Sequence, residues 1–231
     1  MTAARLLVAE TFGPTLQGEG PSCGRQAMFI RLSRCNLRCS YCDTPYTWDW
    51  DRYDPRHEAR WQSVAELAEW VGRNSPRLVV ITGGEPLLQQ DRLVPLLDVL
   101  LADGRRVEIE TNGTIAPALG LVRDGVQFNV SPKLSTAGLA EDHRIVPAAL
   151  TVLANTGNAI FKFVATEPAD LAEVAELEEQ YALASIWVMP EGTTIKVVLD
   201  RARQFADQVI ARGWNLSLRL QVLLWEAARG R

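Results

Sequence analysis

Short apolar runs alternate with amphipathic stretches along most of the chain, and these two patterns predict strands and helices in turn. The predicted strands cover residues 6–10, 29–33, 78–81, 106–110, 126–130, 160–164, 186–189 and 215–225. One predicted helix begins at Ser63, and the others cover residues 87–102, 117–123, 147–153, 169–181 and 194–212. Strands that alternate with helices over short connections are typical of a parallel sheet, so the expected fold class is α/β.

Local signals mark where these elements start and stop. Ser63 and Glu66 form a capping-box pattern in front of an apolar helical stripe. Pro95 lies inside a predicted helix and is expected to kink it. Three glycines and two prolines in residues 11–21 predict a loop, and residues 45–60, rich in Trp, Asp and Arg, are predicted to be irregular.

The polar and glycine-containing motifs of the chain come directly after predicted strands. Barrel enzymes carry their active sites at the carboxyl ends of the strands, so these motifs are expected to meet there. About six such strands make a partial barrel of the (β/α)6 type that is open on one side, and short helices between residues 114 and 159 indicate a trimmed one. No change in composition divides the chain, so we expect one domain over residues 1–231.

Length and composition exclude several classes of protein. The 231 residues, 47% of them hydrophobic, suffice for one sizeable core. The apolar runs are too short to span a membrane and residues 1–7 show no export signal, so we expect a cytoplasmic protein without a membrane partner. A formal net charge of −4 without a basic stripe argues against a nucleic-acid partner.

Three cysteines follow the second predicted strand at the spacing C-x3-C-x2-C: Cys35, Cys39 and Cys42. Iron–sulfur clusters are held by cysteine thiolates, usually four, so three would leave one iron of a four-iron cluster open to an outside ligand. A structural zinc site needs four ligands, and the other candidates, Cys23 and His57, stand apart from any paired motif. Zinc and a disulfide framework are the alternatives to a cluster.

Two single positions near the cysteines suggest binding roles. Arg31 lies inside an apolar strand, so it occupies either an exposed position or a cavity, where its guanidinium would pair with a carboxylate. Asp43-Thr44 follows the last cysteine directly. It predicts either an Asx-type turn or a site where the hydroxyl oxygen of Thr44 binds Mg²⁺.

The cysteine spacing, together with the turn Gly83-Gly84-Glu85 after a buried strand, resembles the radical S-adenosylmethionine (SAM) superfamily. The resemblance implies a [4Fe–4S] cluster whose open iron binds SAM and which passes it one electron to generate a 5′-deoxyadenosyl radical. Glu85 would either accept a hydrogen bond from SAM or only orient its loop. The positions expected at the cofactors are Tyr41, Asp43, Gly84, Glu85, Ser131, Pro132, Lys133, Met189, Pro190, Glu191 and Gly192.

Within that superfamily the chain resembles the 7-carboxy-7-deazaguanine synthase family over nearly its whole length. The specific motifs are Gln17-Gly18-Glu19-Gly20 and Cys42-Asp43-Thr44, whereas Ser33-Arg34 stands where the family has a glycine before the first cysteine. The resemblance implies that 6-carboxy-5,6,7,8-tetrahydropterin loses the hydrogen at C6, contracts its ring and releases ammonia to give 7-carboxy-7-deazaguanine, a precursor of 7-deazapurines such as queuosine. SAM would be regenerated.

The same resemblance implies partners and further site residues. It implies dependence on Mg²⁺, held by Thr44, a homodimer, and an electron donor such as a flavodoxin or a ferredoxin. The positions expected to contact the pterin are Leu16, Gln17, Gly18, Arg31 and Thr82. The rival interpretations are a radical SAM activase that makes a glycyl radical on a protein, a zinc-binding interaction protein, and an inactive homologue.

Overall fold

A computed structural model describes residues 4–226 and 228–231, and within them nine strands form one open sheet in the order β3-β1-β2-β4-β5-β6-β7-β8-β9. From β2 onward the neighbours β2-β4-β5-β6-β7-β8-β9 are parallel, while β1 runs antiparallel to both β2 and β3. The strands are β1 (Arg5–Leu16), β2 (Gln26–Leu32), β3 (Arg60–Ser63), β4 (Leu78–Gly83), β5 (Arg106–Thr111), β6 (Val126–Val130), β7 (Ala159–Ala165), β8 (Ile186–Pro190) and β9 (Asn215–Leu216).

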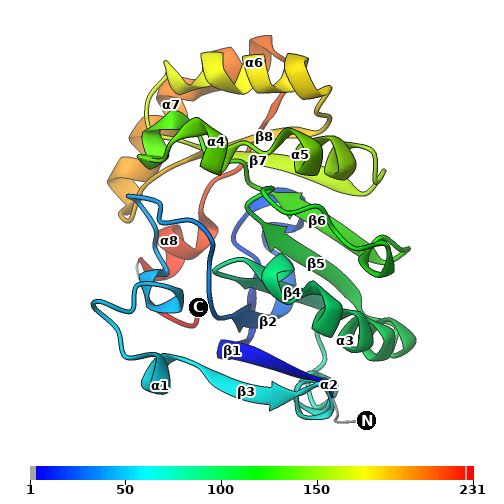
Figure 1. Cartoon of the computed structure of the whole chain (residues 1–231). Helices are drawn as coiled ribbons and strands as arrows, with labels where there is room; N and C mark the ends of the chain where they lie inside the picture. Colours follow the sequence, from blue (N-terminus) through cyan, green and yellow to red (C-terminus); the bar gives the residue numbers. More distant parts are fainter. Residues whose placement is uncertain (1–3, 227) are drawn as a thin grey trace.

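Most helices lie in the connections that lead to the parallel strands and cover the outer face of the sheet (Figure 1): α2 (Val64–Gly72), α3 (Gln90–Ala102), α4 (Glu141–Arg144), α5 (Pro147–Ala154), α6 (Asp170–Tyr181) and α7 (Ile195–Ala211). The short helix α1 (Pro55–Glu58) precedes the edge strand β3, and α8 (Leu220–Trp225) follows β9 and lies at the inner side of the sheet. The α/β prediction is confirmed, and so is the partial barrel, because the sheet does not close and β3 and β9 are its two edge strands. The helices between residues 114 and 159, α4 and α5, are short, as expected. In the described residues there is no helix long and apolar enough to cross a membrane.

The two faces of the strands differ in chemistry. Along β5, Val107 and Ile109 belong to the apolar core that packs under the helices, whereas the alternate residues Glu108 and Glu110 face the inside of the curved sheet. In β7, Lys162 stands between two core phenylalanines in the same way. The period-2 alternation of a strand therefore gives the barrel an apolar outside and a charged interior.

Several sequence predictions are confirmed in detail. Ser63 caps α2, and its side chain and that of Glu66 form the reciprocal capping box. Strand β6 has its predicted bounds, and α6 and α7 begin within one residue of theirs. The weak helix expected over residues 117–123 is only one short 3-10 turn, Leu119–Leu121.

Three predictions are wrong. Strand β1 does not end at residue 10 but runs to Leu16 through Gly13-Pro14, because its pairing with β2 shifts register between Phe12 and Thr15 and leaves room for a proline that cannot donate. The irregular stretch 45–60 contains α1 and leads into the edge strand β3. The expected strand 215–225 ends after two residues and is followed by helix α8.

Candidate functional site

A cavity of about 340 Å³ lies at the carboxyl ends of the parallel strands and collects most of the predicted site residues. The predicted residues that line it are Leu16, Gln17, Gly18, Arg31, Cys35, Cys39, Tyr41, Cys42, Asp43, Thr44, Thr82, Gly84, Ser131, Lys133, Met189 and Glu191. The predicted cofactor residues Glu85, Pro132, Pro190 and Gly192 do not line it.

Backbone hydrogen bonds hold the cluster loop, residues 35–44. The Ser40 amide donates to the Ala137 carbonyl at 3.0 Å outside the loop, and the Cys42 amide donates to the Cys39 carbonyl at 3.2 Å within it. All three cysteines of the loop are free and half-buried. Burial raises the pKa of the Cys35 thiol to about 12 and also raises the pKa of Cys39, so both are thiols until a metal displaces the proton.

The donor set of the loop fits a four-iron cluster better than a zinc ion. Zinc requires ligands that converge within about 2.3 Å of one point. Within the described residues, no three His, Cys, Asp or Glu side chains converge in that way on a single ion. A four-iron cluster takes one thiolate per iron, so its ligands stand around a larger group, as three separate thiols at one cavity do.

The turn after β4 is built against the cluster loop. A Cβ on Gly84 would lie 2.1 Å from the Arg34 carbonyl oxygen and 2.9 Å from Cβ of Cys35, so only glycine fits beside the first cysteine. Glu85 is fully buried and its carboxylate accepts hydrogen bonds from the Leu87 and Asn112 amides and the Thr111 hydroxyl at 2.7–2.8 Å. Of the two roles considered for Glu85, orienting this loop is the one its contacts support.

Lys133 and Tyr41 carry groups suited to a zwitterionic cofactor. The ammonium of Lys133 donates to the Ser131 hydroxyl at 3.0 Å, and Arg144 holds this segment by donating to the Lys133 carbonyl at 2.9 Å. The Tyr41 hydroxyl is buried without a hydrogen-bond partner in the described residues, and burial raises its pKa. Tyr41 therefore keeps a free donor beside the cysteines.

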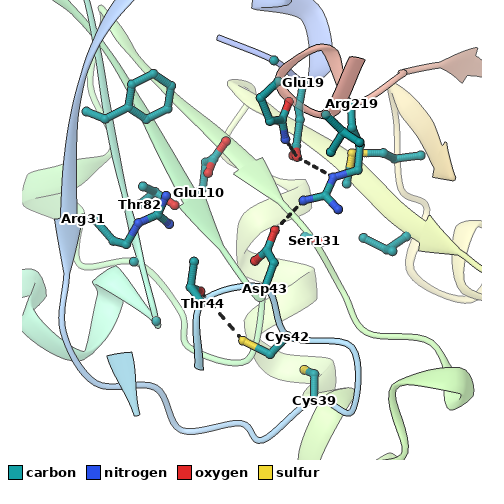
Figure 2. Close-up of a pocket in the computed structure, with 18 of the residues that line it drawn as sticks. Glu19, Arg31, Cys39, Cys42, Asp43, Thr44, Thr82, Glu110, Ser131 and Arg219 are labelled. Atoms are coloured by element: carbon teal, nitrogen blue, oxygen red, sulfur yellow. Dashed lines mark hydrogen bonds and ion pairs between the residues drawn. The ribbon is translucent and has the colours of Figure 1, made fainter. Parts of the chain in front are cut away.

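Arg31 lies in β2 with its guanidinium toward Thr82 (Figure 2). Its Nε donates to Glu10 at 2.7 Å, and its two terminal nitrogens have no hydrogen bond within the described residues. Glu10 also accepts from the Tyr46 hydroxyl at 2.7 Å and from Arg229 at 3.0 Å. The orientation of Arg31 is thus fixed from one side, and its other side is free to bind a carboxylate in bidentate fashion.

The Q-G-E-G loop, residues 17–20, meets a charged group from the barrel interior. The Gln17 amide group donates to Glu110 at 3.2 Å and to Glu108 at 3.4 Å. Glu19 pairs with Lys162, whose Nζ is also 3.9 Å from Glu110. Burial alone would raise the pKa of Glu19, but Lys162 and Arg219 outweigh it and lower that pKa, so Glu19 is a carboxylate.

Gly18 lines the cavity and also packs closely against the C-terminal part of the chain. A Cβ on Gly18 would lie 1.7 Å from Oε1 of Gln221 in α8. The Leu220 amide donates to the Gly18 carbonyl at 2.9 Å. The neighbour that needs the space is therefore the C-terminal part of the chain.

The sequence analysis missed the polar and charged residues that organise the cavity: Glu10, Tyr46, Glu110, Lys162 and Arg219. Their partners lie far apart along the chain, 143 residues for Glu19 and Lys162 and 200 for Glu19 and Arg219. The one local signal was the alternation of charged and apolar residues in β5 and β7, which marks side chains that face the barrel interior.

Comparisons with known proteins agree with this site. The family model "Radical SAM superfamily" matches residues 29–133. The chain is 36% identical to a 7-carboxy-7-deazaguanine synthase of Hyperthermus butylicus over 95% of this chain and 92% of the relative. It is 34% identical to one of Pyrobaculum aerophilum over 98% of both.

Solved structures give the same result. The crystal structure of QueE from Escherichia coli superposes with a TM-score of 0.74 at 29% identity and covers 94% of each chain. SuiB of Streptococcus suis bound to S-adenosylmethionine superposes with a TM-score of 0.57 at 15% identity over 83% of this chain, which shows the shared fold alone. From its motifs, its cavity and these full-length relatives, the chain belongs to the 7-carboxy-7-deazaguanine synthase family of radical SAM enzymes.

Proposed function

We propose that this chain converts 6-carboxy-5,6,7,8-tetrahydropterin to 7-carboxy-7-deazaguanine with release of ammonia, in the biosynthesis of 7-deazapurines such as queuosine. The observation that carries the proposal is one cavity that joins the three-cysteine loop, Arg31 and the Q-G-E-G loop. The relatives that carry this name match the chain over almost their whole length.

The cofactor side of the cavity is formed by thiols and small polar groups. We assign Cys35, Cys39 and Cys42 to a [4Fe–4S] cluster and the segment 131–133 to SAM. When bound, these groups supply the one-electron chemistry that removes a hydrogen atom from the substrate. The ammonium of Lys133 suits the carboxylate of SAM, and Tyr41 supplies a free hydroxyl donor.

The substrate side is polar and charged. We assign the two unoccupied terminal nitrogens of Arg31 to the carboxylate of the pterin, with Thr82 beside them. Leu16, Gln17 and Gly18 are assigned to the pterin ring, where Gln17 is oriented by two interior carboxylates. A planar, carboxylated heterocycle needs this combination of one fixed cation and hydrogen-bonding side chains.

We assign Mg²⁺ to the hydroxyl oxygen of Thr44, which lines the cavity 3.8 Å from the Cys42 sulfur. Magnesium is bound by one or two protein oxygens and otherwise by water and substrate, so a single hydroxyl at the cavity wall suits it. The proposal also includes a homodimer, a flavodoxin or ferredoxin as electron donor, and a cytoplasmic location.

The test is anaerobic reconstitution with iron and sulfide, followed by reductant, SAM, Mg²⁺ and the carboxypterin, with products identified by mass spectrometry. We expect the deazaguanine from the parent chain and none from Cys39→Ala. Cys23→Ala is the matched control, because Cys23 is also a free cysteine but does not line the cavity. Its Sγ lies 3.4 Å from the Gly18 carbonyl oxygen.

The outcome separates this function from the activase. SAM cleavage that leaves the pterin unchanged would reject the substrate assignment and favour a radical SAM activase. Iron retained by Cys39→Ala at the level of the parent chain would reject the cluster assignment. Colourless protein with bound zinc would favour the interaction protein.

A further inference from the structure

Arg219 connects three separate parts of the cavity wall. Its side chain is only 11% exposed, and its Nε lies 3.4 Å from a carboxylate oxygen of Glu19. Its Nη1 donates to the Gly192 carbonyl at 2.9 Å, and its Nη2 forms an ion pair with Asp43 (Figure 2). The Q-G-E-G loop, the loop after β8 and the end of the cluster loop thus share one guanidinium.

Charge neutralisation alone does not require this arrangement. Glu19 already has Lys162 as a buried counterion, and the side chain of Asp43 is 54% exposed, so water can solvate it. A guanidinium is planar and presents its donors in a fixed fork, which makes it suited to hold several acceptors in one geometry. The contacts of Arg219 therefore point to a geometric role.

The backbone around Arg219 is itself fixed to the Q-G-E-G loop. The Gly20 amide donates to the Ser217 hydroxyl at 2.8 Å, and Gln221 donates to Glu19 at 2.7 Å. With the Leu220 amide on the Gly18 carbonyl, contacts on both sides of Arg219 anchor it. A side chain that extends from an anchored backbone can transmit that rigidity to the group it binds.

We propose that Arg219 is a positioning residue that holds the carboxylate of Asp43 and thereby fixes the Asp43-Thr44 end of the cluster loop against the Q-G-E-G loop. Thr44 follows Asp43 directly and is the only position in this loop assigned to Mg²⁺. Arg219 thus acts on the metal site through Asp43. This effect on the metal rests on the proposed function, whereas the fixing of the loop is independent of it.

The fixing of the loop is tested by hydrogen exchange on the cluster-free chain. In Arg219→Gln, the backbone amides in peptides that cover residues 39–47 are expected to exchange about tenfold faster than in the parent chain. A tenfold change corresponds to the lower end of the free energy of a charged hydrogen bond, because the partner, Asp43, is half-exposed. Asp43→Asn, a change at an exposed side chain, is expected to give the same increase. The double variant should exchange no faster than either single variant, because both remove one interaction.

The matched control is Arg123→Gln. Arg123 also joins a carboxylate, Asp98 at 2.5 Å, to a carbonyl, that of Gly120 at 2.7 Å, but it lies outside the cavity lining. We expect it to leave exchange in residues 39–47 unchanged. Parent-like exchange of these peptides in both Arg219→Gln and Asp43→Asn would overturn the proposal, as would additive effects in the double variant.

Kinetics of the reconstituted enzyme test the link to the metal. In Arg219→Gln, the Mg²⁺ concentration that gives the half-maximal rate is expected to rise about tenfold, while kcat falls by a smaller factor. Arg219→Lys should restore part of the affinity for Mg²⁺, because it keeps the charge but not the planar fork. A general loss of structure would lower kcat and leave the Mg²⁺ requirement unchanged, which would contradict a positioning role. If the parent chain makes no deazaguanine, the proposed function fails while the exchange experiment still decides the role of Arg219.

Discussion

Replacing Lys162 by methionine would remove the ammonium at the centre of the barrel while keeping the length of the side chain. The side chain of Lys162 is 6% exposed and pairs with Glu19. In the variant, the carboxylate of Glu19 would keep two partners, Arg219 at 3.4 Å and Gln221 at 2.7 Å. Removing one partner of a buried ion pair costs about 3–5 kcal/mol, and the remaining partners place this case near 3 kcal/mol. With a urea m-value of about 3 kcal/mol/M, the unfolding midpoint should fall by roughly 1 M.

The loss should depend on pH with a definite sign. In the parent chain the folded pKa of Glu19 is lowered, so its stabilising contribution is present above the unfolded value of 4.5 and is lost as pH falls below that value. Without Lys162, only Arg219 and Gln221 still lower the pKa of Glu19, and a loss of about 3 kcal/mol brings this pKa from about 2 back towards its unfolded value of 4.5. The difference in stability between parent and variant should therefore be constant above about pH 5 and shrink as the pH falls from there towards 2.

Urea unfolding of the cluster-free chain under reducing conditions, followed by fluorescence of its seven tryptophans, measures both effects. Lys196→Met is the matched control, because Lys196 pairs with Asp200 on α7 at 85% exposure and its loss should leave the midpoint unchanged. Adding Glu19→Gln to Lys162→Met should recover most of the lost stability. A double variant as unstable as the single one, with a loss that is the same at all pH values, would refute the ion-pair explanation.

Three further predictions concern the loops around the cavity. Gly84→Ala should lower the iron bound per chain after reconstitution while the far-UV circular dichroism is kept, because the new Cβ overlaps Arg34; full iron content would contradict this. Glu85→Ala should lower the free energy of unfolding by about 3 kcal/mol, since it leaves three buried donors without an acceptor, and Glu85→Gln by roughly half as much. Arg31→Gln should raise KM for the pterin about 10- to 100-fold without changing SAM binding by calorimetry, and an unchanged KM would reject its assignment to the carboxylate.

The regular part of the fold follows from the sequence because its signals are local. Strands β4 to β8 are apolar or alternating runs between turns, and the capping box at Ser63 starts α2 where expected. The errors come where tertiary contacts decide. Gly13-Pro14 is accommodated in β1 by a register shift that depends on β2, and α8 forms where Gln221 packs over Gly18.

The site divides in the same way. Residues in contiguous motifs, such as the cysteines, Thr44 and Gly84, were predicted and line the cavity. The residues that orient them were missed, because an ion pair between Glu19 and Lys162 leaves no pattern in either stretch of sequence. Glu85 shows the limit within a motif, since its type and position were clear but its role depended on donors 26 and 27 residues away.

The attachment of residues 217–221 to the Q-G-E-G loop has a consequence for how the protein is made. Gly20 and Ser217 are 197 residues apart, so the loop leaves the ribosome long before its partner has been synthesised. Through most of translation the cluster loop exists, while the wall that contains Arg219, Gln221 and Val222 does not. The three cysteines therefore emerge before the segment that forms the last wall of the cavity has been synthesised.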